Sequence, residues 1–219
     1  MKNAPARSVS TILGVIVGVM RISNNYLVNR AAWLYIEIFR NIPLLVQMFL
    51  WFFVLPELLP EAWGDWMKQL APPWGSYVPA VLCLGIYTSV RVAEQVRAGI
   101  NSLPRGQMMA GTAVGLTLAQ SYRQVILPQS FRIILPPLTS EFLNCIKNSS
   151  VALTIGVMEL TARARAMQEF SFQVFEAFTA ATTIYILVNV VVVFGMRHIE
   201  RKVSVPGFIG KQVEVPAGH

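Results

Sequence analysis

Charged residues are scarce in this sequence. Asp, Glu, Lys and Arg together make up 13% of its 219 residues, whereas 54% are hydrophobic, and the mean hydropathy is +0.53. A soluble domain of this length does not carry such a composition. The sequence therefore predicts an all-α, polytopic membrane protein. Its net charge of +7 is explained by cationic residues that flank the spans, and no nucleic acid is expected as a partner.

Side chains that perform catalysis or bind metals are also few. The two histidines, His198 and His219, lie near the C-terminal end, and there is no HExxH, nucleophile elbow or Cys/His cluster. The phosphate-binding loop G-x-x-x-x-G-K-[ST] is absent as well. We expect no catalytic residue, metal site or cofactor in this chain, so ATP-driven work would need a separate ATPase. The two cysteines, Cys83 and Cys145, are expected to be small core side chains.

About five stretches are candidates for membrane-spanning helices, each of which needs roughly 20 apolar residues. Residues 177–196 form the only run of that length without a charge, and residues 33–56 form a further span. A third span starts at residue 77 and takes Arg91 and Glu94 into the membrane, and a fourth, 133–158, contains Pro136 and Pro137. Residues 8–20 are too short to cross alone, so we expect them to be part of a truncated first span that starts upstream.

The distribution of Lys and Arg predicts the orientation. The residues assigned to the cytoplasmic side are Arg21, Arg30, Arg97, Arg105, Arg123, Arg132, Arg197, Arg201, Lys202 and Lys211. The opposite side carries only Lys68, Arg163 and Arg165. Because cytoplasmic loops are enriched in cations, the segment 97–132 and the C-terminus are predicted to be cytoplasmic. We expect one transmembrane domain over residues 1–205, with a cytoplasmic loop at 104–128, and a cytoplasmic tail over residues 206–219.

The polar loop at 104–128 is unusual between two apolar stretches. Its pattern predicts a helix up to Val114, a break at Gly115 and a short amphipathic helix before Pro128. The apolar face of that second helix consists of Leu118, Tyr122, Val125 and Ile126. Two interpretations remain open on these residues alone: a helix that lies at the membrane surface, or an element that docks on a cytoplasmic partner.

The same loop carries a motif with a specific resemblance. The pattern A-[AG]-x-x-x-G-x9-[IV]-x-L-P is met by Ala110, Gly111, Gly115, Val125, Leu127 and Pro128. It resembles the EAA loop of ATP-binding-cassette (ABC) importer permeases, although Met109 stands where that family has glutamate. Three runs are similar to the polar amino-acid permeases: EIFRNIPLLVQ at 37–47, RVAEQVRAGINSLPRGQ at 91–107 and KNSSVALTIGVMEL at 147–160. Within that family, the runs TSEFLN at 139–144 and PELLPE at 56–61 look most like the glutamate/aspartate importers.

The resemblance implies a type-1 ABC importer permease fold in the bacterial cytoplasmic (inner) membrane. It also implies an amino-acid substrate, with glutamate or aspartate favoured. The implied partners are cytoplasmic ATPase subunits that bind ATP and Mg²⁺, a second permease chain that is identical or related, and an extracytoplasmic substrate-binding protein. The residues implied in coupling to the ATPase are Met109, Ala110, Gly111, Gly115, Leu127 and Pro128.

Polar residues inside the third and fourth spans are candidates for a substrate pathway. Glu141, Asn144 and Asn148 share one helical face, with Lys147 beside them, and could either line a wet pathway or bond neighbouring helices. The spacing of Arg91 and Glu94 is that of an ion pair within one helix. The alternative hypothesis is that Arg91 binds the side-chain carboxylate of an acidic amino acid.

Two other functions are also compatible with these residues, and one glycine spacing concerns helix packing. Intramembrane charges would also suit a self-contained ion-coupled transporter or channel, and a non-transporting membrane scaffold is a third possibility. Gly14 and Gly18 form a G-x-x-x-G that either marks a close helix–helix interface or arises by chance in a Gly- and Val-rich run.

Overall fold

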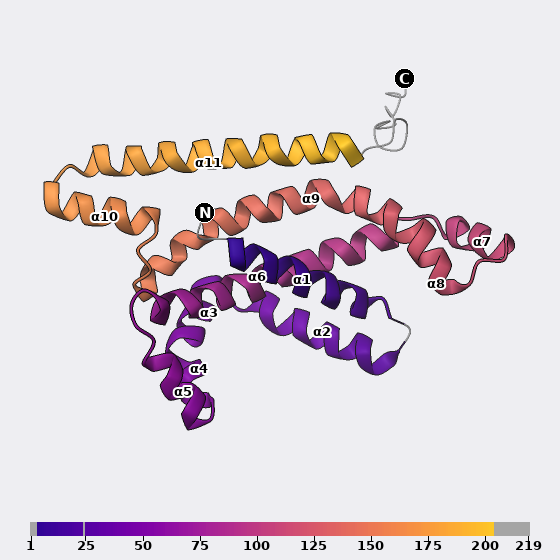
Figure 1. Ribbon diagram of the computed structural model, residues 1–219, viewed down its shortest axis with the longest axis horizontal. Coiled ribbons are helices and arrows are strands. Elements are labelled where there is room, and N and C mark those ends of the chain that lie inside the picture. The colour runs from indigo at the N-terminus through magenta and orange to yellow at the C-terminus, as the bar shows by residue number, and fades with distance from the viewer. Residues whose placement is uncertain (1–3, 24, 204–219) are drawn as a thin grey trace, which may run out of the picture.

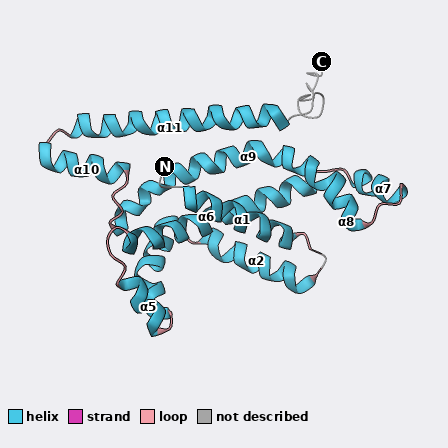
Figure 2. Cartoon of the chain, viewed as in Figure 1, coloured by secondary structure: helices cyan, strands magenta, loops and turns pink. Residues whose placement is uncertain are grey.

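The computed structural model describes residues 4–23 and 25–203, and every regular element in these ranges is a helix (Figure 2). Three long helices, α6 (Trp74–Asn101), α9 (Leu127–Asn148) and α11 (Val174–Val203), run lengthwise through the molecule (Figure 1). Helices α1 (Ala4–Arg21) and α2 (Tyr26–Asn41) lie along α6. The predicted tail at 206–219 lies outside the described residues.

Helix α1 packs on α6 through its glycines. A Cβ on Gly14 would lie 2.5 Å from the Cβ of Val92, and one on Gly18 would lie 2.8 Å from the Cβ of Val96. Such distances leave no room for a side chain, so the two glycines let the helix backbones approach closely. The G-x-x-x-G therefore marks a helix–helix interface within the chain.

The span predicted over residues 33–56 is a candidate span in the structure, but it is sharply bent and not a single helix. Helix α2 ends at Asn41, Pro43 cannot continue the helical hydrogen bonding, and the chain turns by 103° before α3 (Leu44–Phe49). The bend exposes backbone carbonyls, and the buried Gln47 donates from Nε2 to the carbonyls of Phe39 at 2.7 Å and Ile42 at 3.0 Å. A buried amide thus stabilises the corner that the apolar pattern did not indicate.

Two prolines lie just after a π-helical turn. The turns are η1 (Leu50–Val54) before Pro56 and η2 (Tyr122–Ile126) before Pro128. At each turn the next backbone N–H bonds the carbonyl five residues back, from Leu55 to Leu50 and from Leu127 to Tyr122. Because proline donates no hydrogen bond, a wider turn keeps the helix continuous where an ordinary one would break.

The outer corner of the molecule is a small helical hairpin of α4 (Leu55–Leu58) and α5 (Glu61–Lys68). Gly64 approaches the carbonyl oxygen of Pro56, so the two helices pack closely. Lys68 Nζ lies 2.8 Å from Glu57 Oε1 across the hairpin, and this hydrogen bond raises the pKa of Lys68.

The predicted fourth span has different limits. The helical run is continuous from α8 (Leu118–Ser121) through η2 into α9, with Pro136 and Pro137 inside the helix. After Asn148 the chain tightens into the 3₁₀ helix η3 (Ser149–Ile155), which ends at Gly156 with φ +81°. The hydroxyls of Ser149 and Ser150 bond the carbonyls three residues back, which favours this tighter turn over a longer α-helix.

By length and composition, two helices of the described part can cross a membrane: α6 and α11, with the bent pair at residues 26–58 as a third candidate. They differ in how far the rest of the chain covers them. Of an 18-residue apolar stretch in each helix, 56% is buried in α6 and only 11% in α11. Helix α11 rests on the body through a narrow stripe that includes Ala177 and Ala181. Cys83 and Cys145 are buried and unbonded to each other, as expected for core side chains.

The helices bring the predicted cationic segments to one end of the molecule. The α1–α2 turn, the segment with α7 (Arg105–Ala113) and α8, and the C-terminal end of α11 lie together there (Figure 1). The hairpin of α4 and α5 and helix α10 (Leu160–Ser171) lie at the opposite end. This is the distribution that the positive-inside rule requires of a membrane protein.

Candidate functional site

The loop at 104–128 folds as a helix–turn–helix that projects from one end of the molecule (Figure 1). Helix α7 ends at Ala113, Gly115 has φ +86°, and α8 begins at Leu118, as the glycine break predicts. Thr117 and Gln120 form a capping box in which the Thr117 side chain accepts from the Gln120 N–H and the Gln120 side chain accepts from the Thr117 N–H. The side of the turn that leads into α8 is thus held by local hydrogen bonds.

Its two motif glycines serve different purposes. A Cβ on Gly111 would lie 2.8 Å from Ser121 Oγ, so this glycine lets α7 pack against α8. A Cβ on Gly115 would meet nothing within 4 Å, but the positive φ is a conformation that L residues rarely adopt. Gly111 is therefore required by packing, and Gly115 by backbone geometry.

The predicted separate helix before Pro128 is wrong, because α8 continues through η2 into α9. Its predicted apolar face is only partly covered. Ile126 is buried and Tyr122 and Val125 are half-buried, but Leu118 is 51% exposed. Leu118 joins Met109, 67% exposed, and Val114, 77% exposed, in an apolar surface at the tip of the turn, which we call the coupling tip.

The other predicted coupling residues lie on both sides of this turn. Ala110 and Pro128 are exposed, and Leu127 is 43% exposed. The side chain of Gln129 reaches back from α9 and donates to Gln107 of α7 at 3.4 Å. The motif thus spans one continuous exposed element that leads directly into α9.

The ion pair predicted between Arg91 and Glu94 does not form. Glu94 instead accepts from Arg97, with Nη2 2.8 Å from Oε2, while Arg91 donates to the hydroxyl of Tyr87 at 3.1 Å and stacks over that ring at 5.3 Å. In a helix, an ion pair is more favourable when the glutamate precedes its basic partner, which explains why Glu94 pairs with Arg97 and not with Arg91. Arg91 therefore has no carboxylate partner among the described residues.

Tyr87, Arg91, Glu94 and Ala98 form a stripe on the one face of α6 that the rest of the chain leaves open. Arg91 and Ala98 are exposed and Tyr87 and Glu94 half-exposed, whereas Val90, Val92 and Ala93 on the other faces are buried. We call this surface the α6 stripe.

On α9, the structure separates residues that the helical spacing groups together. Glu141 is buried, only 7% exposed, and its Oε2 has no hydrogen-bond partner in the described part of the chain. Lys147 is exposed, and Asn144 and Asn148 are half-exposed. Lys147 and the two asparagines can meet water or a partner, whereas Glu141 faces the chain's own interior.

Comparison with known proteins identifies the family. Residues 10–205 match the family described as "Binding-protein-dependent transport system inner membrane component". The chain belongs to this family. It is therefore the membrane permease subunit of an ABC importer, a transport component whose ATPase is a separate subunit. This confirms the resemblance of the EAA motif and sets aside the self-contained channel and the scaffold.

Individual relatives agree with the assignment. The permease is 46% identical over 203 residues to the glutamate/aspartate import permease protein GltJ of Escherichia coli strain K12, covering 92% of this chain and 82% of GltJ. It is 39% identical over 176 residues to PatM of Vibrio harveyi, described as a probable amino-acid ABC transporter permease, covering 80% of this chain and 75% of PatM.

Solved structures share the fold. One chain of a structure described as "Crystal structure of an amino acid ABC transporter with histidines" superposes with a TM-score of 0.79 at 29% identity, covering 92% of the permease and 88% of that chain. A chain of the MetNI methionine ABC transporter superposes with a TM-score of 0.76 at 17% identity, over 93% and 92% of the two chains, which shows the fold alone. The predicted type-1 importer architecture is confirmed.

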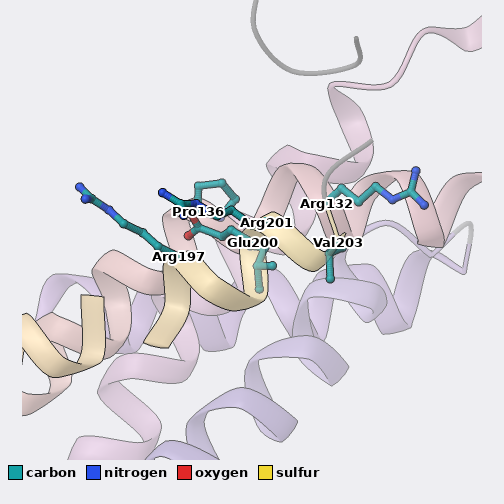
Figure 3. Close-up of a pocket in the computed structure, with 7 residues that line it drawn as sticks. Arg132, Pro136, Arg197, Glu200, Arg201 and Val203 are labelled. Carbon is teal, nitrogen blue, oxygen red and sulfur yellow. The ribbon is translucent and has the colours of Figure 1, made fainter. Parts of the chain in front are cut away.

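One feature of the permease has no counterpart in the sequence predictions. A cavity of about 250 Å³ lies between α9 and the C-terminal end of α11 (Figure 3). Its lining consists of Arg132, Leu135, Pro136, Arg197, Glu200, Arg201 and Val203. These residues come from segments about 60 positions apart, so no local spacing could have grouped them; their only sequence signal was the excess of cations at this end.

Proposed function

We propose that this permease imports acidic amino acids, glutamate and aspartate, across the bacterial cytoplasmic membrane. Its 46% identity to GltJ, whose name states that substrate pair, supports this choice. An acidic amino acid carries one carboxylate more than its amide, so a transporter that distinguishes them needs a cation that can pair with the extra charge.

The α6 stripe is the observation on which the pathway rests. Helix α6 is otherwise the most enclosed long helix, yet it leaves an arginine and a glutamate uncovered within a membrane-spanning segment. Ionised groups at that depth are costly against lipid and are found facing water or protein. The stripe therefore faces the second permease chain, and the substrate passes between the two chains along it.

Arg91 is the residue we assign to the substrate's side-chain carboxylate. Tyr87 holds its guanidinium by a hydrogen bond and by stacking, both of which preserve the positive charge. A planar guanidinium has five N–H donors, and Arg91 uses one of them, toward Tyr87, among the residues that the structure describes. Enough donors remain to bind a carboxylate with two parallel hydrogen bonds.

The remaining pathway residues are Glu94, Asn144, Lys147 and Asn148, which the structure leaves at least partly open. Glu141 reaches the substrate only in a state in which α9 has moved, because its carboxylate is buried in this conformation. A buried carboxylate oxygen without a hydrogen-bond partner costs free energy. A conformation in which this oxygen has a partner is favoured by the free energy so recovered.

Coupling takes place at the opposite end of α9 from these residues. The coupling tip offers three exposed apolar side chains on a rigid turn, which suits insertion into a groove of a cytoplasmic ATPase subunit that binds ATP and Mg²⁺. Met109, in place of the family's glutamate, makes this contact apolar. A substrate-binding protein delivers the amino acid at the far end, beside α10 and the α4–α5 hairpin.

Uptake by the reconstituted importer, with its ATPase and binding protein, tests the proposal. Arg91→Gln should lower glutamate and aspartate uptake by about tenfold to a hundredfold, since a hydrogen bond to a charged group contributes about 1.5–3 kcal/mol. Arg30→Gln, which removes an exposed cation that stacks over Trp33 as Arg91 stacks over Tyr87, is the matched control. Equal loss in both variants, or unchanged uptake in Arg91→Gln, would refute the role of Arg91; wild-type importer that moves neither acid would refute the substrate class.

A further inference from the structure

The cavity between α9 and α11 continues into a second one along α11. The second cavity, of about 230 Å³, is lined by Phe194, Arg197, His198 and Arg201. It shares Arg197 and Arg201 with the first, so the two form one basic depression that runs across the end of α11. This depression is separate from the α6 stripe and from the coupling tip.

The position of the depression relative to the membrane follows from α11, the helix that forms most of it. Residues 177–196 of α11 carry no charge and, at about 1.5 Å per residue, extend about 30 Å, the thickness of the hydrocarbon core. Arg197 is the first residue beyond that run. The guanidinium groups therefore lie at the level of the lipid headgroups, on the side that carries the coupling tip.

The charges around the depression suit an anion. Three arginines line it against one carboxylate, and Glu200 Oε1 already accepts a hydrogen bond of 2.8 Å from Thr139 Oγ1. In Figure 3, Arg201 and Glu200 lie over Pro136, while Arg197 and Arg132 reach away on opposite sides. Arg132 and Arg197 form no ion pair with any carboxylate in the described part of the chain.

Apolar surface adjoins these cations on the membrane side. Phe194 lines the second cavity beside Arg197 and is 66% exposed. Leu187 and Val191 continue that exposed surface toward the membrane centre at helical spacing. A free phosphate ion would gain nothing from this surface, whereas the acyl chain of a lipid would lie along it.

From this arrangement we propose that the depression binds an anionic phospholipid. Arg197 and Arg201 hold the phosphate, Arg132 adds positive charge at the far side of the cavity, and an acyl chain lies on Phe194 and the exposed face of α11. Basic pockets between membrane helices are sites of this kind. The lipid would lie against α9, the helix that continues directly from the coupling tip.

Calorimetric titration of the complete importer, delipidated in a neutral detergent, tests the site. The probe is short-chain phosphatidylglycerol, with the matching phosphatidylcholine and inorganic phosphate as comparators. The variant Arg197→Gln/Arg201→Gln should weaken phosphatidylglycerol binding about 30-fold, from about 1 kcal/mol for each arginine. Arg197→Lys/Arg201→Lys should restore most of it, and the control Arg163→Gln/Arg165→Gln, which removes the same charge from α10, should bind as the wild type does.

Three results would overturn the proposal. Equal weakening in the control would mean that net charge alone attracts the lipid. Binding of inorganic phosphate as tight as that of phosphatidylglycerol would identify a site for a free anion. Absence of phosphatidylglycerol binding to the complete wild-type importer, in which the ATPase subunits are docked, would show that the depression takes no lipid in the assembled transporter.

Discussion

Replacement of Gly115 by valine should leave the permease in the membrane but uncouple it from its ATPase. The residue has φ +86°, and a Cβ there would meet no atom within 4 Å, so the cost is conformational rather than steric. For an L residue a left-handed conformation costs about 1–2 kcal/mol, and a β-branched side chain tolerates it least. A cost of that size lowers the population of the native turn about 5- to 30-fold.

The assay is the stimulation of ATP hydrolysis by loaded binding protein in the reconstituted importer. Gly115→Val should lose the stimulation while its yield from membranes stays unchanged, and Gly115→Asn should retain most of it because asparagine tolerates positive φ. Gly111→Ala should fail for a different reason, because the added Cβ would lie 2.8 Å from Ser121 Oγ. A second substitution, Ser121→Gly, should therefore rescue Gly111→Ala and should leave the defect of Gly115→Val unchanged. Full stimulation in Gly115→Val, or equal loss in the valine and asparagine variants, would refute the argument from φ.

Three further predictions concern the stability of the fold. Gln47→Leu should lower the thermal midpoint in detergent, because two carbonyls at the α2–α3 bend lose their donor at about 1–3 kcal/mol each; an unchanged midpoint would mean that water replaces the amide. Gly14→Ala should destabilise the α1–α6 interface and be rescued in part by Val92→Gly, which removes the Cβ that the new methyl group would meet at 2.5 Å; additive effects in the double-mutant cycle would contradict the contact. Tyr185→Phe removes a 2.9 Å hydrogen bond to Glu159 and should cost about 1.5–3 kcal/mol in unfolding free energy, measurable by denaturant titration.

The coupling loop was the part of the site most open to prediction. Its break depends on one residue, Gly115, whose backbone freedom is a property of the amino acid, and its second helix depends on a cap between Thr117 and Gln120, three positions apart. Both signals are local, so the sequence contains them in full. What it did not reveal was continuity past Pro128, because a π turn is decided by how the helix packs and not by any short pattern.

The pathway residues show where local reasoning ends. Glu94 has an arginine three positions away on each side, so the spacing could not choose between Arg91 and Arg97, although the order of charges favoured Arg97. Burial of Glu141 next to the half-exposed Asn144 depends on which helices cover α9, and that is a tertiary property. The 103° bend after Asn41 has the same origin: Pro43 permits a corner, but the buried Gln47 is needed to stabilise it.

The continuity of α8, η2 and α9 constrains how ATP use can reach the pathway. Leu118 of the coupling tip and Lys147 belong to one helical run from Leu118 to Asn148, so a displacement at Leu118 acts on α9 as a whole. Helix α9 packs tightly on α6 where Gly99 accommodates Ile134, in the half of α9 nearer the tip. A tilt about that contact moves the two ends of the run in opposite directions and by similar amounts, because the arm from Leu118 to Ile134 and the arm from Ile134 to Asn148 are similar in length. The polar residues Asn144, Lys147 and Asn148 lie on the far arm, so a movement at the ATPase reaches the substrate's path through α9 itself.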